Sequence, residues 1–73
     1  MKVRELEKRI IIVEEEFWGE LFVFPDTYYL IRGVGDNCKV IAHGNKEDIL
    51  KGCPTPGGHP CIRWAVEDAM KGD

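Results

Sequence analysis

The chain has 73 residues, of which 44% are hydrophobic, and a formal net charge of −3 at pH 7. This length allows a single small domain over residues 1–73, and the many β-branched and aromatic side chains argue against disorder. The excess of acidic residues is the wrong sign for a protein that binds nucleic acid through its phosphates. The longest apolar runs, of which Ile10–Val13 is one, are too short to span a membrane, and no secretory signal is apparent. We therefore expect a cytoplasmic protein without a membrane partner.

The first predicted element covers residues 9–13, whose sequence is Arg-Ile-Ile-Ile-Val. Such a concentration of β-branched side chains is typical of a strand. Leu6, Ile10, Val13 and Phe17 are also spaced like one face of a helix over residues 3–17. The strand is the preferred prediction, and the helix is the alternative.

Turn residues then divide the chain into further strands. Residues 18–24 and 27–32 are predicted to form a hairpin around Pro25 and Asp26, because proline presets φ and aspartate bonds its own backbone in a turn. Residues 33–37 predict a second turn, and residues 38–42 the strand after it. Together these segments form an antiparallel meander of three strands, or of four with residues 9–13.

Two helices are predicted after the meander. Asn45 is a good N-cap, Asp48 suits the third helical position, and Gly52 closes a short helix over residues 46–51. Residues 53–59 are rich in proline and glycine and are expected to be an irregular connector. Pro60 fits the first turn of a final helix, which has one apolar face. The predicted fold class is α+β: an antiparallel three- to four-stranded meander followed by two helices packed on one face.

Both faces of the predicted hairpin are apolar. Side chains alternate along a strand, so one face carries Phe22, Phe24, Tyr29 and Ile31, and the other carries Leu21, Val23, Tyr28 and Leu30. Two short helices can cover only one of these faces. The other face must meet the N-terminal segment if that is a helix, a second copy of the chain, or a partner protein. Alternatively, the two tyrosines lie at the rim of the sheet with solvated hydroxyls.

The residues expected to contact a partner are aromatic side chains of the hairpin, with neighbouring glutamates as an acidic rim. The aromatic residues are Trp18, Phe22, Tyr28 and Tyr29, and the glutamates are Glu14, Glu15 and Glu16. Adjacent exposed glutamates do not form a catalytic pair in a domain with little room for a pocket, so no catalytic residue is expected.

The three cysteines are an odd number, which is unlike a disulfide scaffold, so reduced thiols are expected. Cys53, His59 and Cys61 are weak candidates for a zinc site, because they supply only three ligands and lack a C-x₂₋₄-C pair. Cys61 also lies at a predicted helix start, where the dipole stabilises a thiolate, with His59 as a base and Cys53 as a second thiol. Cys38 and His43 point to opposite faces unless a bulge intervenes. No cofactor is expected.

The favoured function is a non-enzymatic protein-binding or self-associating module, such as a homodimer, that uses an apolar sheet face. One alternative is a zinc- or thiol-dependent protein built on Cys53, His59 and Cys61. The other is a nucleic-acid-binding module of sheet and helix, in which Arg32 and Lys39 touch phosphates.

Overall fold

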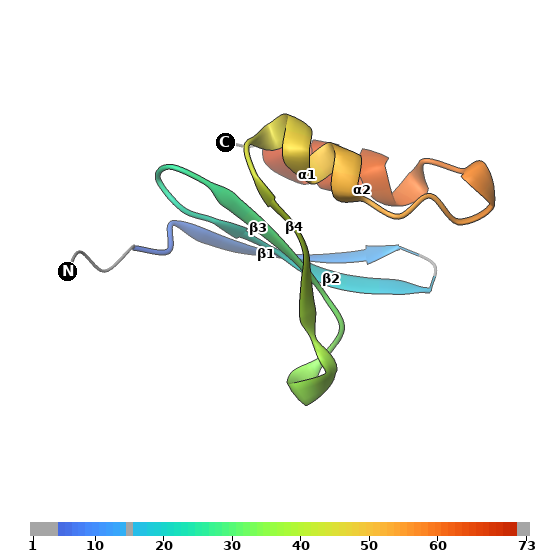
Figure 1. Ribbon diagram of the computed structural model, residues 1–73, viewed down its shortest axis with the longest axis horizontal. Helices are drawn as coiled ribbons and strands as arrows, with labels where there is room; N and C mark the ends of the chain where they lie inside the picture. Colours follow the sequence, from blue (N-terminus) through green and yellow to red (C-terminus); the bar gives the residue numbers. More distant parts are fainter. Residues whose placement is uncertain (1–4, 15, 72–73) are drawn as a thin grey trace.

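The computed structural model describes residues 5–14 and 16–71. The four strands are β1 (Lys8–Glu14), β2 (Phe17–Val23), β3 (Tyr28–Arg32) and β4 (Lys39–Gly44). The two α-helices are α1 (Lys46–Gly52) and α2 (Cys61–Lys71), and short 3-10 turns lie at Gly35–Asn37 and Pro56–Gly58. The predicted α+β meander followed by two helices is confirmed (Figure 1).

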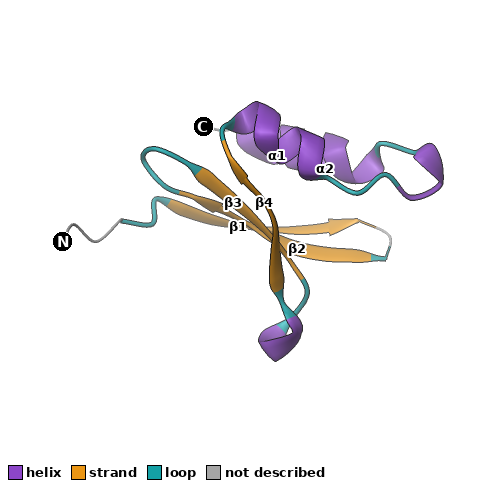
Figure 2. Ribbon diagram, viewed as in Figure 1, coloured by secondary structure: helices purple, strands orange, loops and turns teal. Residues whose placement is uncertain are grey.

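The four strands form one antiparallel sheet in the order β1-β2-β3-β4, so β1 and β4 are its edges. The sheet is strongly twisted, and both helices lie on the same side of it (Figure 2). The segment around residues 9–13 is a strand, as preferred, because its burial alternates: Ile12 is buried, whereas Ile11 and Val13 are exposed. The alternative helix over residues 3–17 does not form among the described residues.

The pairing of β3 with β4 contains a bulge. Leu30 pairs with Ala42 but Ile31 pairs with Val40, so Ile41 is the extra residue. An extra residue shifts the alternation of side chains along a strand by one position. Val40 and His43 therefore share a face, whereas a regular strand would place them on opposite faces.

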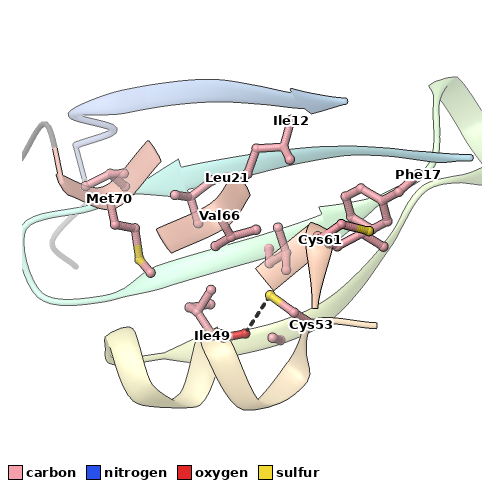
Figure 3. Close-up of a cluster of buried hydrophobic side chains, with 12 residues drawn as sticks. Ile12, Phe17, Leu21, Ile49, Cys53, Cys61, Val66 and Met70 are labelled. Carbon is pink, nitrogen blue, oxygen red and sulfur yellow. Dashed lines mark hydrogen bonds between the residues drawn. The ribbon is translucent and has the colours of Figure 1, made fainter. Parts of the chain in front are cut away.

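The core lies between the sheet and the helices (Figure 3). Helix α1 packs on β4 and β3, and α2 packs on β1. The sheet face that packs against the helices carries Leu21, Val23, Tyr28 and Leu30, which were predicted to share one face of the hairpin. Leu21 and Leu30 are fully buried. The buried core residues are Ile12, Phe17, Leu21, Val23, Leu30, Ala42, Ile49, Cys53, Cys61, Ile62, Val66 and Met70.

The helix boundaries follow local signals. Asn45 and Asp48 form a capping box: Asp48 N donates to Asn45 Oδ1 at 2.9 Å, and Asn45 N donates to Asp48 Oδ2 at 3.1 Å. The connector before α2 contains a 3-10 turn at Pro56–Gly58, within which Gly57 departs from helical geometry with a positive φ of 65°. Within the described part of the chain, no helix is long and apolar enough to cross a membrane.

Candidate functional site

The side of the sheet that faces away from the helices is here named the open face. Side chains alternate between the two faces of a strand, so the strand register shows which residues of the four strands lie on the open face. Phe24 follows β2 and is included because its ring contacts Tyr29. The most exposed apolar side chains of the open face are Ile11 and Val13 at 54% each, Val40 at 50% and Trp18 at 44%. The open face consists of Arg9, Ile11, Val13, Trp18, Glu20, Phe22, Phe24, Tyr29, Ile31, Val40 and His43.

One row of side chains crosses the open face from edge to edge: Arg9, Phe22, Tyr29 and His43 are successive cross-strand partners. The Arg9 guanidinium lies 5.8 Å from the centroid of the Phe22 ring. The Tyr29 and His43 rings stack, with centroids 5.9 Å apart and an interplanar angle of 26°. Phe24 meets Tyr29 edge-on, with centroids 5.6 Å apart. Because neighbouring rings hold one another in place, this row is an ordered aromatic surface.

The next row of the open face is aliphatic with one acid in it. Ile11, Glu20, Ile31 and Val40 are successive partners, and Val13 pairs with Trp18 beyond them. The guanidinium of Arg9 bonds the carboxylate of Glu20, with Arg9 Nε donating to Glu20 Oε1 at 3.1 Å. The negative charge of Glu20 is therefore balanced by the positive charge of Arg9. This pair adds no net charge to the otherwise apolar centre of the open face.

The structure brings together three of the four aromatic residues that were expected to contact a partner. Trp18, Phe22 and Tyr29 lie on the open face. Tyr28 points to the opposite side, where it is half-buried and packs against the core. The reason is the two-residue repeat of a strand, which sends neighbours to opposite faces.

Two glutamates of the predicted acidic rim, Glu14 and Glu16, lie away from the open face. Glu14 is half-buried at the end of β1, on the same side of the strand as Ile12, and Glu16 is exposed in the turn that follows. Both border a depression of about 340 Å³ on the helix side, which Phe17, Arg32 and the connector before α2 also line. Glu15 lies outside the described residues.

Sequence reasoning missed six open-face residues: Arg9, Ile11, Val13, Glu20, Val40 and His43. The first three follow from a two-residue repeat once residues 9–13 are taken as a strand. The place of Val40 depends on the bulge at Ile41, for which the sequence carries no clear signal.

The zinc and thiol candidates do not converge on one point. Cys53 is buried, and its Sγ donates to the carbonyl of Ile49 at 3.2 Å (Figure 3). Burial raises the pKa of the Cys53 thiol from 9.0 to about 11, with a smaller opposing effect from Arg63. Cys61 is buried at the first position of α2, whereas His59 is exposed and meets the Trp64 ring at 5.5 Å. Among the described residues, no three His, Cys, Asp or Glu side chains are grouped as metal ligands.

The cysteines are also unbridged. Cys38 is exposed just before β4, and Cys53 and Cys61 are free thiols within the core.

Comparisons of the chain with protein-family models, with curated proteins and with solved structures found no match. What the chain does is therefore inferred from its own surface.

Proposed function

We propose that this chain is a non-enzymatic protein-binding module whose open face docks on an apolar surface of another protein chain. One observation supports this above all: aromatic and aliphatic side chains from all four strands lie on a sheet face that neither helix covers. Burying apolar surface stabilises a complex by about 25 cal/mol per Å² before the costs of association. A continuous exposed apolar face of this kind is characteristic of an interaction surface.

The chemistry of the open face favours an apolar partner surface over a charged one. Its acid, Glu20, is already bonded to Arg9, so a partner need not supply a counter-charge. Trp18, Tyr29 and Arg9 are of the residue types that dominate binding energy at protein interfaces. We expect these side chains to contribute most of the binding energy.

The same features disfavour the nucleic-acid alternative. Stacking of bases on aromatic rings requires basic side chains close by to hold the phosphates. Arg32 and Lys39 are paired neighbours on β3 and β4, but Arg32 stands over Phe17, on the helix side of the sheet. The aromatic row of the open face instead has Arg9, whose charge is engaged by Glu20.

We also propose that the module works in the reducing cytoplasm. The odd number of cysteines supports this, because a disulfide scaffold normally has an even number that pair with one another.

The test compares two pairs of substitutions with matched chemistry and exposure. Trp18→Ser with Val40→Thr removes apolar surface from the open face. Trp64→Ser with Val34→Thr removes the same groups elsewhere, where Trp64 is 58% and Val34 63% exposed. Proteins that the unaltered chain retains from an extract of the cells that make it are identified and purified, and their affinity for all three chains is measured by calorimetry.

We expect the open-face pair to weaken binding of the purified partner by at least about tenfold, which corresponds to about 1.4 kcal/mol. The control pair should bind like the unaltered chain. Equal affinities for the two pairs, or the lack of any partner whose binding depends on the open face, would contradict the proposal. Circular dichroism of both variants checks that the fold is retained.

A further inference from the structure

One edge of the sheet is the outer side of β1. Within the described residues, β1 pairs only with β2, so its other side has no strand beside it. Its centre is four consecutive β-branched residues, Ile10–Val13, without proline, glycine or charge. Its pairing with β2 is regular over all seven residues. A regular, apolar edge of this length is a template for pairing with another strand.

The opposite edge of the sheet, β4, is less regular than β1. Strand β4 carries the bulge at Ile41 and ends in Gly44, which takes a positive φ of 124°. Bulges and glycines interrupt the row of backbone groups that a new strand would need. Of the two edges, β1 is therefore the one suited to accept a strand.

The sequence of β1 is complementary to itself when it is read in the opposite direction. Ile11 is the middle residue of the seven in Lys8–Glu14. In an antiparallel pair centred on Ile11, Lys8 lies opposite Glu14 of a second copy at both ends of the strand. Ile10 then lies opposite Ile12, and Arg9 opposite Val13. Opposite charges and β-branched pairs in facing positions both stabilise antiparallel strands.

Neighbouring registers lose this match. The two copies keep their core sides aligned only if the register shifts by an even number of residues. Centring the pair on Ile10 places Lys8 opposite Ile12, and centring it on Ile12 places Glu14 opposite Ile10. Either shift loses both Lys8–Glu14 pairs and shortens the paired segment. The charges at the two ends of β1 therefore select the register centred on Ile11.

We propose that two copies of this chain join through their β1 strands, antiparallel and centred on Ile11, to form one continuous sheet. The inference deepens the proposed function, because it names the second copy as one partner, but it uses the sheet edge and not the open face. The two-fold axis runs through the sheet, so both pairs of helices lie on one side and both open faces on the other.

The pairing also enlarges the proposed binding surface. Four strands about 4.8 Å apart, with about 3.4 Å per residue, give each copy an open face of about 400 Å². Joining two copies doubles this to about 800 Å², the area that each partner buries in a standard protein interface. Ile11 and Val13, which lie at the margin of one copy, come to the centre of the joined face.

Charge reversal at the two ends of β1 tests the pairing. Lys8→Glu leaves acids at both ends of the strand, and Glu14→Lys leaves bases at both ends, so each variant alone repels itself. We expect sedimentation equilibrium to show dimers of the unaltered chain at about 100 µM, and each single variant to dimerise at least about tenfold more weakly. An equimolar mixture of the two variants, and the chain with both substitutions, should regain the affinity of the unaltered chain.

A cross-link tests the register independently of charge. Residues directly opposite in an antiparallel pair have Cα atoms about 4.5–5.5 Å apart, within the range of a disulfide. In a Cys38→Ser background, Ile11→Cys should form a disulfide-linked dimer with oxidised glutathione as the oxidant. Val40→Cys is the matched control, because it is equally exposed on the same face of the other edge strand. It should form no disulfide-linked dimer.

Three results would overturn the pairing: an unaltered chain that stays monomeric at this concentration, single charge variants that dimerise normally, or equal cross-linking of the Ile11→Cys and Val40→Cys chains. These results leave the open-face proposal unaffected, because that proposal is measured with Trp18 and Val40 variants against a different protein. Conversely, a failed open-face test leaves the expected β1-mediated dimer unaffected.

Discussion

The ring of Phe17 lies directly over Gly19, two residues further along the same side of β2. A Cβ added at Gly19 would stand 2.6 Å from two carbons of that ring and 2.8 Å from the carbonyl oxygen of Ile31. The guanidinium of Arg32, the cross-strand partner of Gly19, lies 5.5 Å from the Phe17 ring centroid. The missing side chain at Gly19 thus makes room for a buried aromatic ring at the corner of the core.

Gly19→Ala is expected to destabilise the chain, although alanine is ordinarily better than glycine in a strand by about 0.5–1 kcal/mol. The added methyl group must displace either the ring or the backbone of β3, and overpacking of this kind costs about 1–3 kcal/mol. Equilibrium unfolding in urea measures the change. In a Phe17→Leu background the cost should be smaller, and an unchanged or increased free energy of unfolding for Gly19→Ala would contradict the described contact.

Asn45→Ala should lower the free energy of unfolding by about 1 kcal/mol, because it removes the acceptor for the amide of Asp48 at the start of α1. The matched control is Asn45→Asp, which keeps an oxygen in the same place and should be near neutral. Urea unfolding of both variants tests this. Equal losses for alanine and aspartate would show that the side-chain acceptor is unimportant.

The three thiols should differ sharply in reactivity. Cys38 is exposed, whereas Cys53 and Cys61 are buried. A disulfide reagent at about pH 8 should label one thiol quickly and the other two only as the chain unfolds, since the thiolate is the reactive form and must be accessible. Cys38→Ser should abolish the fast phase. Fast labelling of a second thiol in the folded chain would contradict the buried positions.

The stability of the fold should fall at high pH through Cys53. Its pKa is about 11 in the folded chain and 9.0 as the ordinary value, so the unfolded chain loses this proton first. Between these values the folded state binds more protons, and the free energy of unfolding decreases by up to about 1.4 kcal/mol per pH unit from this group. Below pH 9 the Cys53 thiol is protonated in both the folded and the unfolded chain, so it does not change the free energy of unfolding.

The control for this pH dependence is Cys53→Ala, because lysines and tyrosines titrate in the same range. Thermal or urea unfolding at a series of pH values should give a shallower decline for the variant than for the unaltered chain. Parallel declines would mean that Cys53 ionises equally easily in the folded and unfolded states.

Much of the fold is encoded locally. The turn at Pro25 and Asp26, the cap at Asn45 and the amphipathic stripe of the last helix each depend on residues close together in the chain, so the elements could be predicted from the sequence. The sequence also showed that the hairpin has apolar side chains on both faces, more than two short helices can cover. It correctly indicated that one sheet face stays open.

Other features depended on contacts between distant segments. Residues 9–13 fit both a helical and a strand repeat, and the choice came from pairing with β2 and packing under α2. The bulge at Ile41 placed Val40 beside Ile31, and Tyr28 went to the core face because register fixes which of two neighbouring tyrosines turns inward. The position of β1 at an edge was decided only by strand order. Local propensity determines which elements form, whereas burial shared among all strands determines which side chains remain available for binding.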